Sequence, residues 1–173
     1  PVIVIAPSKT NQSYSTVGTS VTSLGNEKIQ ENGKFFLGEV LNDNLPGMNY
    51  FRSGGFGTVS GIQLRGLPKR YSTVYIDGVK MSDPSSSDNS YYFSNVMNSS
   101  IKNVEILRGS QSSMYGSGAI GGAINIYTKN GDDKNLNKLA VSSGVNGTKN
   151  LDASIGNKYY NHSYYIGVNL FDT

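Results

Sequence analysis

The 173-residue chain has no cysteine, no tryptophan and a single histidine, His162. Without cysteine it can form no disulfide, no thiol nucleophile and no cysteine-based zinc site. One imidazole also excludes every site that needs two. No apolar run is long enough for a transmembrane helix. Charged residues make up only 16% of the chain and the net charge is +3, so the chain offers no basic surface for a nucleic acid.

Small and polar residues are abundant instead. Glycine alone contributes 21 residues, and glycine, serine and asparagine together exceed a third of the chain. These residues favour turns and loops. The large aliphatic residues and phenylalanine make up about a quarter of the chain, just above the ~20% below which chains usually stay disordered. We therefore expect short strands joined by long ordered loops around a modest core.

Two short helices and then five strands are expected in the first three quarters of the chain. The first helix spans Gly25–Gly33, because Asn26 can cap its start and Gly33 can end it. The second begins at Phe36, and Leu45-Pro46-Gly47 ends it. The candidate strands are Met48–Arg52, Gly61–Arg65, Thr73–Asp77, Asn103–Leu107 and Ala123–Thr128. The predicted core consists of Ile62, Leu64, Val74, Ile76, Val104, Ile106, Ile124 and Ile126.

The last part of the chain has a different pattern. Residues 136–173 alternate apolar and small or polar residues, with turn-like breaks at Asn146-Gly147 and at Lys158–Asn161. This pattern predicts a meander of three antiparallel strands. Three strands with one apolar face cannot close on themselves.

Several motifs permit chemistry without requiring it. Gly116–Gly121 matches G-x-G-x-x-G, but a strand-like segment follows it, which favours a tight turn over a nucleotide site. Asp77, Asp83 and Asp88 lack the regular spacing of a calcium loop, so solvated loop acids are favoured over a cation site. No G-x-S-x-G nucleophile motif is present. We therefore expect that the chain is not an enzyme and that it binds no metal ion and no cofactor.

Five phrases of the sequence together resemble the plug domain of TonB-dependent outer-membrane receptors, closest to the cobalamin receptor branch. They are Leu45-Pro46-Gly47-Met48, Ile62–Gly66 (IQLRG), Val74–Val79 (VYIDGV), Ile101–Gly109 (IKNVEILRG) and Ser112–Ile126 (SSMYGSGAIGGAINI). They occur in the order and at the spacing of that family. One departure is Ser110, where the family usually has proline after Arg-Gly.

The resemblance implies a fold class and a domain organisation. The fold is α+β, a small mixed-sheet plug domain with two short helices, followed by an antiparallel β meander that would begin a transmembrane β-barrel. Residues 1–8 would be a TonB-box-like coupling segment, residues 9–130 the plug domain, and residues 131–173 the first strands of an incomplete barrel.

The resemblance also implies partners for the N-terminus. The segment Val2, Ile3, Val4, Ile5 and Ala6 looks like the TonB box, which a TonB-type energy-coupling protein grips. A free β-branched segment can add as a strand to an exposed sheet edge. We expect this segment to lie outside the plug core and to pair, if at all, as an edge strand. A frayed terminus is the alternative.

Two loops, a first at Ser53–Ser60 and a second at Asp83–Tyr92, resemble the outward-facing apices of the family's plug. The residues expected to contact ligand are Ser53, Phe56, Thr58, Asp83, Ser85, Asp88 and Tyr91. Hydroxyls, amides and a few aromatic rings suit a large polar nutrient of the cobalamin or siderophore class. The scarcity of arginine and lysine in these loops favours the former.

Arg65 and Arg108 are each the middle residue of a Leu-Arg-Gly phrase that ends a β-run. Taken alone, each arginine can be a plain surface cation or a cation that faces carboxylates on another domain. The resemblance favours docking against carboxylates of the missing barrel wall. The implied location is the bacterial outer membrane, with the plug inside the barrel and the N-terminus facing the periplasm. The function so implied is gated, energy-dependent uptake of a scarce nutrient. The alternative is a free-standing soluble plug-like binding module.

Overall fold

The computed structural model describes residues 3–31 and 33–173. Val2 of the expected coupling segment therefore lies outside the described residues, as does the side chain of Ile3. The chain divides into two compact units, the first ending at Tyr127 and the second spanning Thr128–Thr173. Each unit is described by itself.

Within the described residues, the first unit combines short helices with nine strands. The helices are α1 (Asn26–Glu31), α2 (Leu37–Asn44) and α3 (Ser112–Tyr115), with 3-10 turns η1 (Tyr14–Thr16), η2 (Lys69–Tyr71) and η3 (Phe93–Asn95). The strands are β1 (Ile3–Val4), β2 (Gln12–Ser13), β3 (Ser20–Gly25), β4 (Met48–Arg52), β5 (Ser60–Leu64), β6 (Ser72–Ile76), β7 (Val79–Met81), β8 (Ile101–Arg108) and β9 (Gly122–Thr128). The two expected helices and five expected strands are all present.

A five-stranded mixed sheet forms the centre of this unit. Its strand order is β3-β8-β9-β6-β7. Strands β6 and β9 are parallel, whereas β3 with β8 and β6 with β7 are antiparallel. Asp77 and Gly78, at φ 48° and 82°, form the two-residue turn between β6 and β7, which suits the twist of a tight hairpin. Strands β4 and β5 form a separate hairpin.

Side chains alternate between the two faces of the sheet, and each face carries its own apolar cluster. The main cluster lies on the face covered by α1, α2 and the β4–β5 hairpin. Of the eight predicted core residues it contains Ile62, Leu64, Val74, Val104, Ile106, Ile124 and Ile126 as buried members, and Ile76 is partly buried against it. The predicted core is thereby confirmed.

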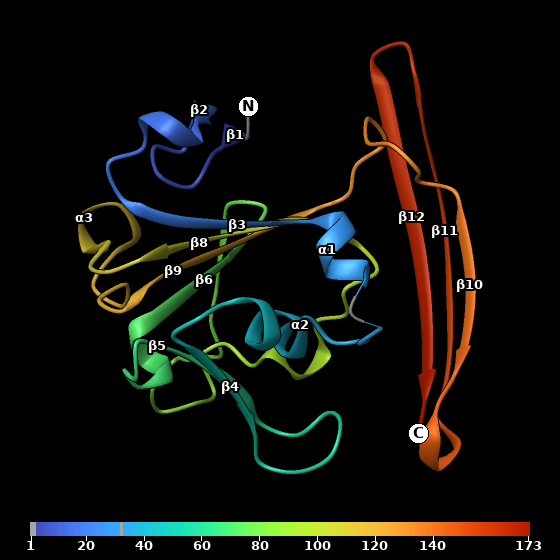
Figure 1. The fold of residues 1–173 in the computed structure, drawn as a ribbon, viewed down its shortest axis with the longest axis horizontal. Coiled ribbons are helices and arrows are strands. Elements are labelled where there is room, and N and C mark those ends of the chain that lie inside the picture. Colours follow the sequence, from blue (N-terminus) through green and yellow to red (C-terminus); the bar gives the residue numbers. More distant parts are fainter. Residues whose placement is uncertain (1–2, 32) are drawn as a thin grey trace. The chain divides into compact units, whose positions relative to one another are not determined.

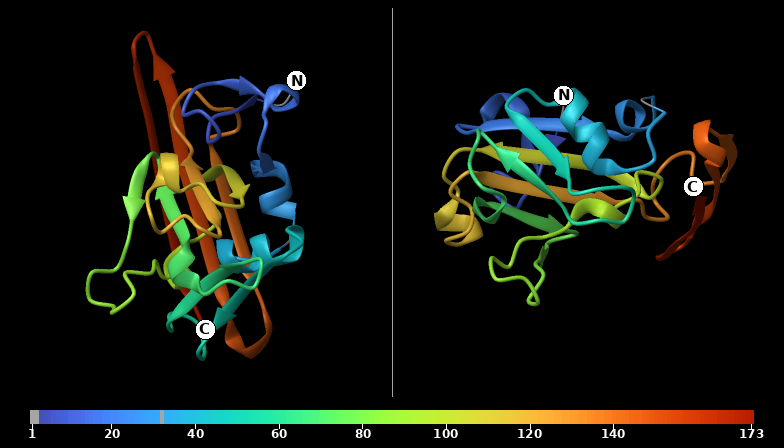
Figure 2. Two further views of the ribbon diagram at one scale, coloured as in Figure 1. Left: turned by 90° about the vertical axis from the view of Figure 1, so that its left-hand side faces the viewer. Right: turned by 90° about the horizontal axis from the view of Figure 1, so that it is seen from below.

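The second cluster lies on the opposite face and includes the N-terminal segment. Its buried members are Val4, Ala6, Val21, Leu107, Tyr115, Ala119 and Ala123. Figures 1 and 2 show the sheet between the N-terminal residues on one side and α2 with the β4–β5 hairpin on the other. The expectation that this segment lies outside the plug core is wrong for Val4 and Ala6, which are 0% and 1% exposed. The small side chains of Ala119 and Ala123 leave room for Val4 and Ala6 in this cluster.

The glycine-rich motif at Gly116–Gly121 makes a tight turn before β9. Gly116 has φ 84° and can adopt it because it has no Cβ. A Cβ at Gly121 would lie 3.1 Å from the carbonyl oxygen of Tyr71, and one at Gly122, where φ is 149°, would clash with the carbonyl oxygen of Leu107. A strand follows the motif, as predicted, so its glycines serve close backbone packing.

We expect Gly122→Ala to lower the free energy of unfolding by about 1–3 kcal/mol, the usual range for overpacking. The added methyl group would have to displace the backbone of β8, which lies between β3 and β9 in the sheet. Gly25→Ala is the matched control, because nothing lies within 4 Å of a Cβ there. Denaturant titration followed by circular dichroism measures both. Equal stabilities for the two variants would contradict the argument.

The second unit is a meander of three antiparallel strands. They are β10 (Lys138–Ser143), β11 (Lys149–Tyr159) and β12 (His162–Asp172), with the 3-10 turn η4 (Val145–Gly147) after β10. The predicted three-strand meander and its turn at Asn146-Gly147 are confirmed. No helix in residues 3–31 or 33–173 is both long and apolar enough to span a membrane.

One face of this meander is apolar and exposed. The register places Leu139 beside Ala153 and Val168, and Val141 beside Leu151 and Leu170. Leu139 and Val141 are 76% and 78% exposed. Lys138, at the start of β10, pairs with Asp152 at 3.1 Å. Two-residue alternation thus gives a sheet with one apolar face.

Candidate functional site

The N-terminal segment is held against the sheet through a buried carboxylate. Oε2 of Glu105 accepts hydrogen bonds from the backbone N–H groups of Ile5 and Ala6, at 2.8 and 2.7 Å. Its other oxygen, Oε1, accepts one from Nδ2 of Asn103 at 3.1 Å. Glu105 is only 1% exposed, and a carboxylate so buried requires hydrogen-bond donors. The N-terminal backbone supplies two of them.

Tyr115 provides the complementary contact. Its hydroxyl donates a hydrogen bond of 2.5 Å to the carbonyl oxygen of Ala6. The short helix α3 positions this ring, and the hydroxyl of Tyr75 donates to the backbone oxygen of Tyr115 at 3.2 Å. The rings of Tyr75 and Tyr115 meet edge to face, with centroids 5.1 Å apart. Val4, Ile5 and Ala6, hereafter the docked segment, are thus held by one acceptor and one donor from the plug.

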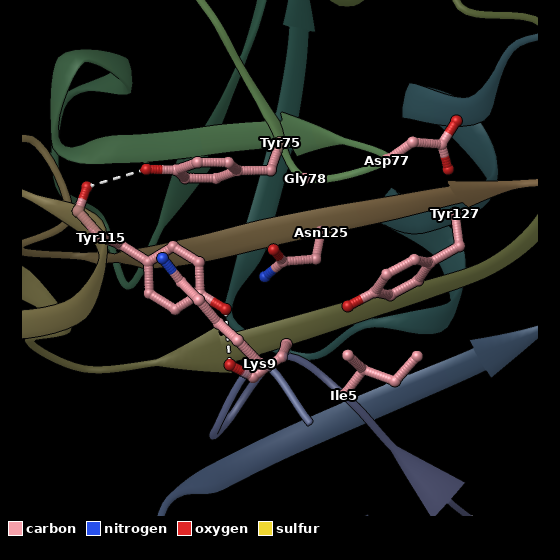
Figure 3. A pocket seen from close by; sticks show the side chains of 9 residues that line it. Ile5, Lys9, Tyr75, Asp77, Gly78, Tyr115, Asn125 and Tyr127 are labelled. Carbon is pink, nitrogen blue, oxygen red and sulfur yellow. Dashed lines mark hydrogen bonds between the residues drawn. The ribbon is translucent and has the colours of Figure 1, made fainter. Parts of the chain in front are cut away.

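A cavity of about 400 Å³ borders the docked segment. It is lined by Ile5, Ala6, Lys9, Tyr75, Asp77, Gly78, Tyr115, Asn125 and Tyr127. Figure 3 shows Asn125 between the rings of Tyr115 and Tyr127. The Lys9 ammonium lies 5.4 Å from the centre of the Tyr115 ring. The segment forms part of the cavity wall, so this cavity exists only while the segment is docked.

The phenols of Tyr115 and Tyr127 remain protonated. Burial raises the pKa of Tyr115, and the nearby Glu105 charge adds to this, although Asn125 opposes it. Burial also raises the pKa of Tyr127, again reinforced by Glu105. Because a neutral phenol is a donor, Tyr115 keeps its hydrogen bond to Ala6 throughout the physiological pH range.

The residues expected at the first loop are at the surface. Ser53 is exposed, and Thr58 is half-buried, its hydroxyl donating to the carbonyl oxygen of Gly55 at 2.8 Å. Phe56, 40% exposed, stacks on Phe36 with ring centroids 5.0 Å apart. The Arg52 guanidinium lies 4.5 Å from the Phe56 ring and pairs with Glu39 at 3.0 Å.

The second loop is ordered by its own side chains. Oδ1 of Asp83 accepts hydrogen bonds from the backbone N–H and the hydroxyl of Ser85, at 2.9 and 2.6 Å, and these lower the pKa of Asp83. Asp88 pairs with Lys69 at 3.5 Å. Tyr91 packs edge to face on Phe93 and is partly buried against the main core, so it contributes to packing. Asp77 lies elsewhere, at the β6–β7 turn.

Arg65 and Arg108 lie near each other although 43 positions separate them in the chain. A Cβ at Gly109 would be 3.7 Å from a guanidinium nitrogen of Arg65. Arg65 is exposed and Arg108 is half-buried. Among residues 3–31 and 33–173, neither arginine forms an ion pair. The Arg65 side chain lies beside Gly109, the residue that follows Arg108.

Sequence reasoning missed Glu105 and Tyr115 as functional candidates. Both lie among apolar residues of strand β8 and the glycine-rich segment that precedes β9, which by themselves indicate packing. A usable signal was the alternation of β8: Val104 and Ile106 face the main core, so Glu105 must face the other side. A charged residue in the centre of a buried strand indicates a partner that sequence alone does not identify.

Comparison with known proteins places the fold in one family. The profile of the TonB-dependent Receptor Plug Domain matches residues 13–123. The vitamin B12 transporter BtuB of Photobacterium profundum is 30% identical over 154 residues, covering 89% of this chain and 25% of the transporter. The ferric yersiniabactin uptake receptor FyuA from Yersinia pestis matches with TM-score 0.68 and 25% identity, over 92% of this chain and 25% of FyuA.

A further solved structure resembles almost the whole chain in fold. BauA, the ferric preacinetobactin receptor from Acinetobacter baumannii, matches with TM-score 0.78 and 16% identity, over 99% of this chain and 25% of BauA. The predicted fold class is confirmed by this likeness. The chain spans about a quarter of the length of these relatives. These relatives are a transporter and receptors rather than enzymes, in line with the expectation from the sequence. Because the family profile covers more than half of it, the chain belongs to the TonB-dependent receptor plug domain family.

Proposed function

We propose that this chain is the plug and gating part of a TonB-dependent outer-membrane receptor that takes up a scarce nutrient. In this proposal residues 1–8 are the coupling segment, residues 9–130 the plug, and residues 131–173 the first strands of a barrel that surrounds it. The observation that carries it is the docked segment, an extended apolar stretch attached to the plug by a few hydrogen bonds to Glu105 and Tyr115.

The mechanism follows from where the two ends of the plug lie. Both loops lie on the side of the sheet away from the docked segment (Figures 1 and 2). Nutrient binds the loops, and the coupling segment is released to the periplasmic side. A TonB-type protein then grips Val2, Ile3, Val4, Ile5 and Ala6 as an added strand. Traction on this strand rearranges the plug and opens a path.

The barrel assignment of residues 131–173 rests on the apolar face of β10–β12. Strands that cross an outer membrane alternate between lipid-facing and inward-facing residues, and these three strands alternate in that way. Arg65 and Arg108, which lack ion pairs in the described part of the chain, then dock against carboxylates of the barrel wall. A free-standing soluble module does not account for an exposed apolar sheet face.

The proposed ligand is a large polar nutrient of cobalamin type. Ser53, Phe56 and Thr58 from the first loop, and Asp83, Ser85, Asp88 and Tyr91 from the second, form the candidate floor of its site. Two of the cations beside these loops are paired, Arg52 with Glu39 and Lys69 with Asp88. The loops themselves contain hydroxyls and aromatic rings but no lysine or arginine, which disfavours a strongly anionic ferric siderophore.

Uptake by living cells tests this proposal. Cells that express the receptor containing this chain are given radiolabelled cobalamin, or a ferric siderophore as the competing candidate, with and without the inner-membrane coupling protein. We expect cobalamin to bind in both strains and to accumulate only when the coupling protein is present. Accumulation that is independent of the coupling protein would refute the gating role. Accumulation of the siderophore alone would refute the proposal that the ligand is of cobalamin type.

A further inference from the structure

We propose that Glu105 and Tyr115 are positioning residues that set the balance between the docked and released states of the N-terminal segment, and thereby regulate its access to a partner strand. The proposal rests on the proposed function for its biological meaning. Its physical content is an intramolecular binding site for an extended apolar peptide, formed by a buried carboxylate and a tyrosine hydroxyl.

The contacts of the docked segment exclude a partner strand. An added strand binds through backbone N–H and C=O groups. In the docked state the N–H groups of Ile5 and Ala6 donate to Glu105, and the C=O of Ala6 accepts from Tyr115. Residues Ile3 and Val4 pair with Ser13 and Gln12 of β2. A partner can therefore pair with this segment only after the contacts with the plug are broken.

The same contacts make release reversible. Within the described part of the chain no cation pairs with Glu105, so its buried carboxylate depends on Asn103 and on the docked segment for hydrogen bonds. When the segment leaves, water can reach the carboxylate and replace the lost donors. Release therefore costs less than breaking a contact that would leave an unsatisfied buried charge. The apolar part of the attachment is small, consisting mainly of Val4 and Ala6.

The neighbouring side chains provide matched controls. Tyr75 lies in ring contact with Tyr115, but its hydroxyl donates to the backbone of Tyr115 and not to the docked segment. Tyr115→Phe and Tyr75→Phe therefore each remove one hydroxyl from the same aromatic pair, and only the first loosens the segment. Glu105→Gln keeps one oxygen that can face the two N–H groups, whereas Glu105→Ala removes both.

Thiol labelling measures the released population directly. The chain has no cysteine, so Val4→Cys introduces a single thiol in these 173 residues at a position that is 0% exposed when docked. The detergent-solubilised full-length receptor, lacking any other accessible thiol, is labelled with a maleimide in the absence of nutrient and coupling protein. When opening and closing are fast, the labelling rate follows the population of the open state.

We expect Tyr115→Phe to accelerate labelling about threefold to tenfold, as for loss of one neutral hydrogen bond. Glu105→Ala should accelerate it by roughly tenfold to a hundredfold, because hydrogen bonds to a charged group are stronger. Glu105→Gln should fall between the parent and Glu105→Ala. Tyr75→Phe should leave the rate within about twofold of the parent, since the contacts of the segment are intact.

A separate single-cysteine variant, Val74→Cys in the main core, distinguishes release of the segment from unfolding of the plug. Its labelling should stay slow in every variant. The proposal is overturned if Tyr115→Phe leaves labelling at position 4 unchanged, or if it accelerates labelling at positions 4 and 74 equally. Because this assay uses no nutrient and no partner, its failure is distinct from a failure of uptake, which would refute the proposed function instead.

Discussion

Val4→Pro is expected to weaken the affinity of the intact receptor for the coupling protein at least about tenfold and to stop uptake, because proline cannot donate to a strand pair and restricts φ. This loss of affinity is opposite in sign to the effect of undocking alone, which would make the segment more accessible to the coupling protein. Proline also disturbs the pairing of Val4 with Gln12, which releases the segment, yet the released strand can no longer pair fully with its partner. Calorimetric titration of the receptor with the coupling protein measures the change.

The control for this prediction is Val4→Ala, which keeps the backbone N–H and removes only part of the side chain. It should bind the coupling protein within about threefold of the parent, since backbone hydrogen bonds provide most of the affinity of an added strand. Tyr115→Phe should shift binding in the opposite direction, toward higher affinity, because it raises the released population. Unchanged binding by Val4→Pro would remove the coupling role from this segment.

Ile106→Ala is expected to lower the stability of the first unit by about 2–5 kcal/mol. Ile106 is 1% exposed, and β8, which carries it, lies between β3 and β9. Its truncation leaves a cavity in the main cluster, to which Ile62, Val104 and Ile124 also belong. Hydrogen exchange read by mass spectrometry measures the loss locally, as faster exchange in β8 and β9.

Val79→Ala provides the comparison within the same sheet. Val79 lies on the edge strand β7 and is 64% exposed, so its truncation should change stability by no more than about 0.5 kcal/mol. Exchange in β10–β12 should be unaffected by Ile106→Ala, because those strands belong to the other compact unit. Similar losses for Ile106→Ala and Val79→Ala would mean that the cluster around Ile106 is not the main source of stability.

The fold was largely predictable because its determinants are local. Alternation in Val104 and Ile106, and again in Ile124 and Ile126, marks strands whose apolar face must be buried. The turn at Asn146-Gly147 was also predictable, since this dipeptide favours a turn and separates two alternating segments. The short hairpin strand β7 and the four-residue helix α3 were missed, because such short elements depend on tertiary contacts more than on a periodic pattern.

The candidate site was less predictable because it depends on contacts across about a hundred positions of sequence. The bonds from Ile5 and Ala6 to Glu105 join residues 100 and 99 positions apart. The β-branched residues of Val2–Ala6 predicted a free segment that pairs, if at all, as an edge strand, and nothing in that pattern indicates a side-chain acceptor. Docking requires only that one carboxylate and one phenol lie on the right face of the sheet.

The apolar face of β10–β12 also governs how the protein must be handled. Strands β10 and β12 are the outer strands of a three-stranded sheet, and long exposed strands with apolar faces associate edge to edge in water. Val168 and Leu170 are 53% and 59% exposed on 11-residue β12. We therefore expect the 173-residue chain, purified alone in aqueous buffer, to form oligomers that size-exclusion chromatography would detect. Detergent micelles or lipid nanodiscs cover this face and are the appropriate solvent for purification and storage.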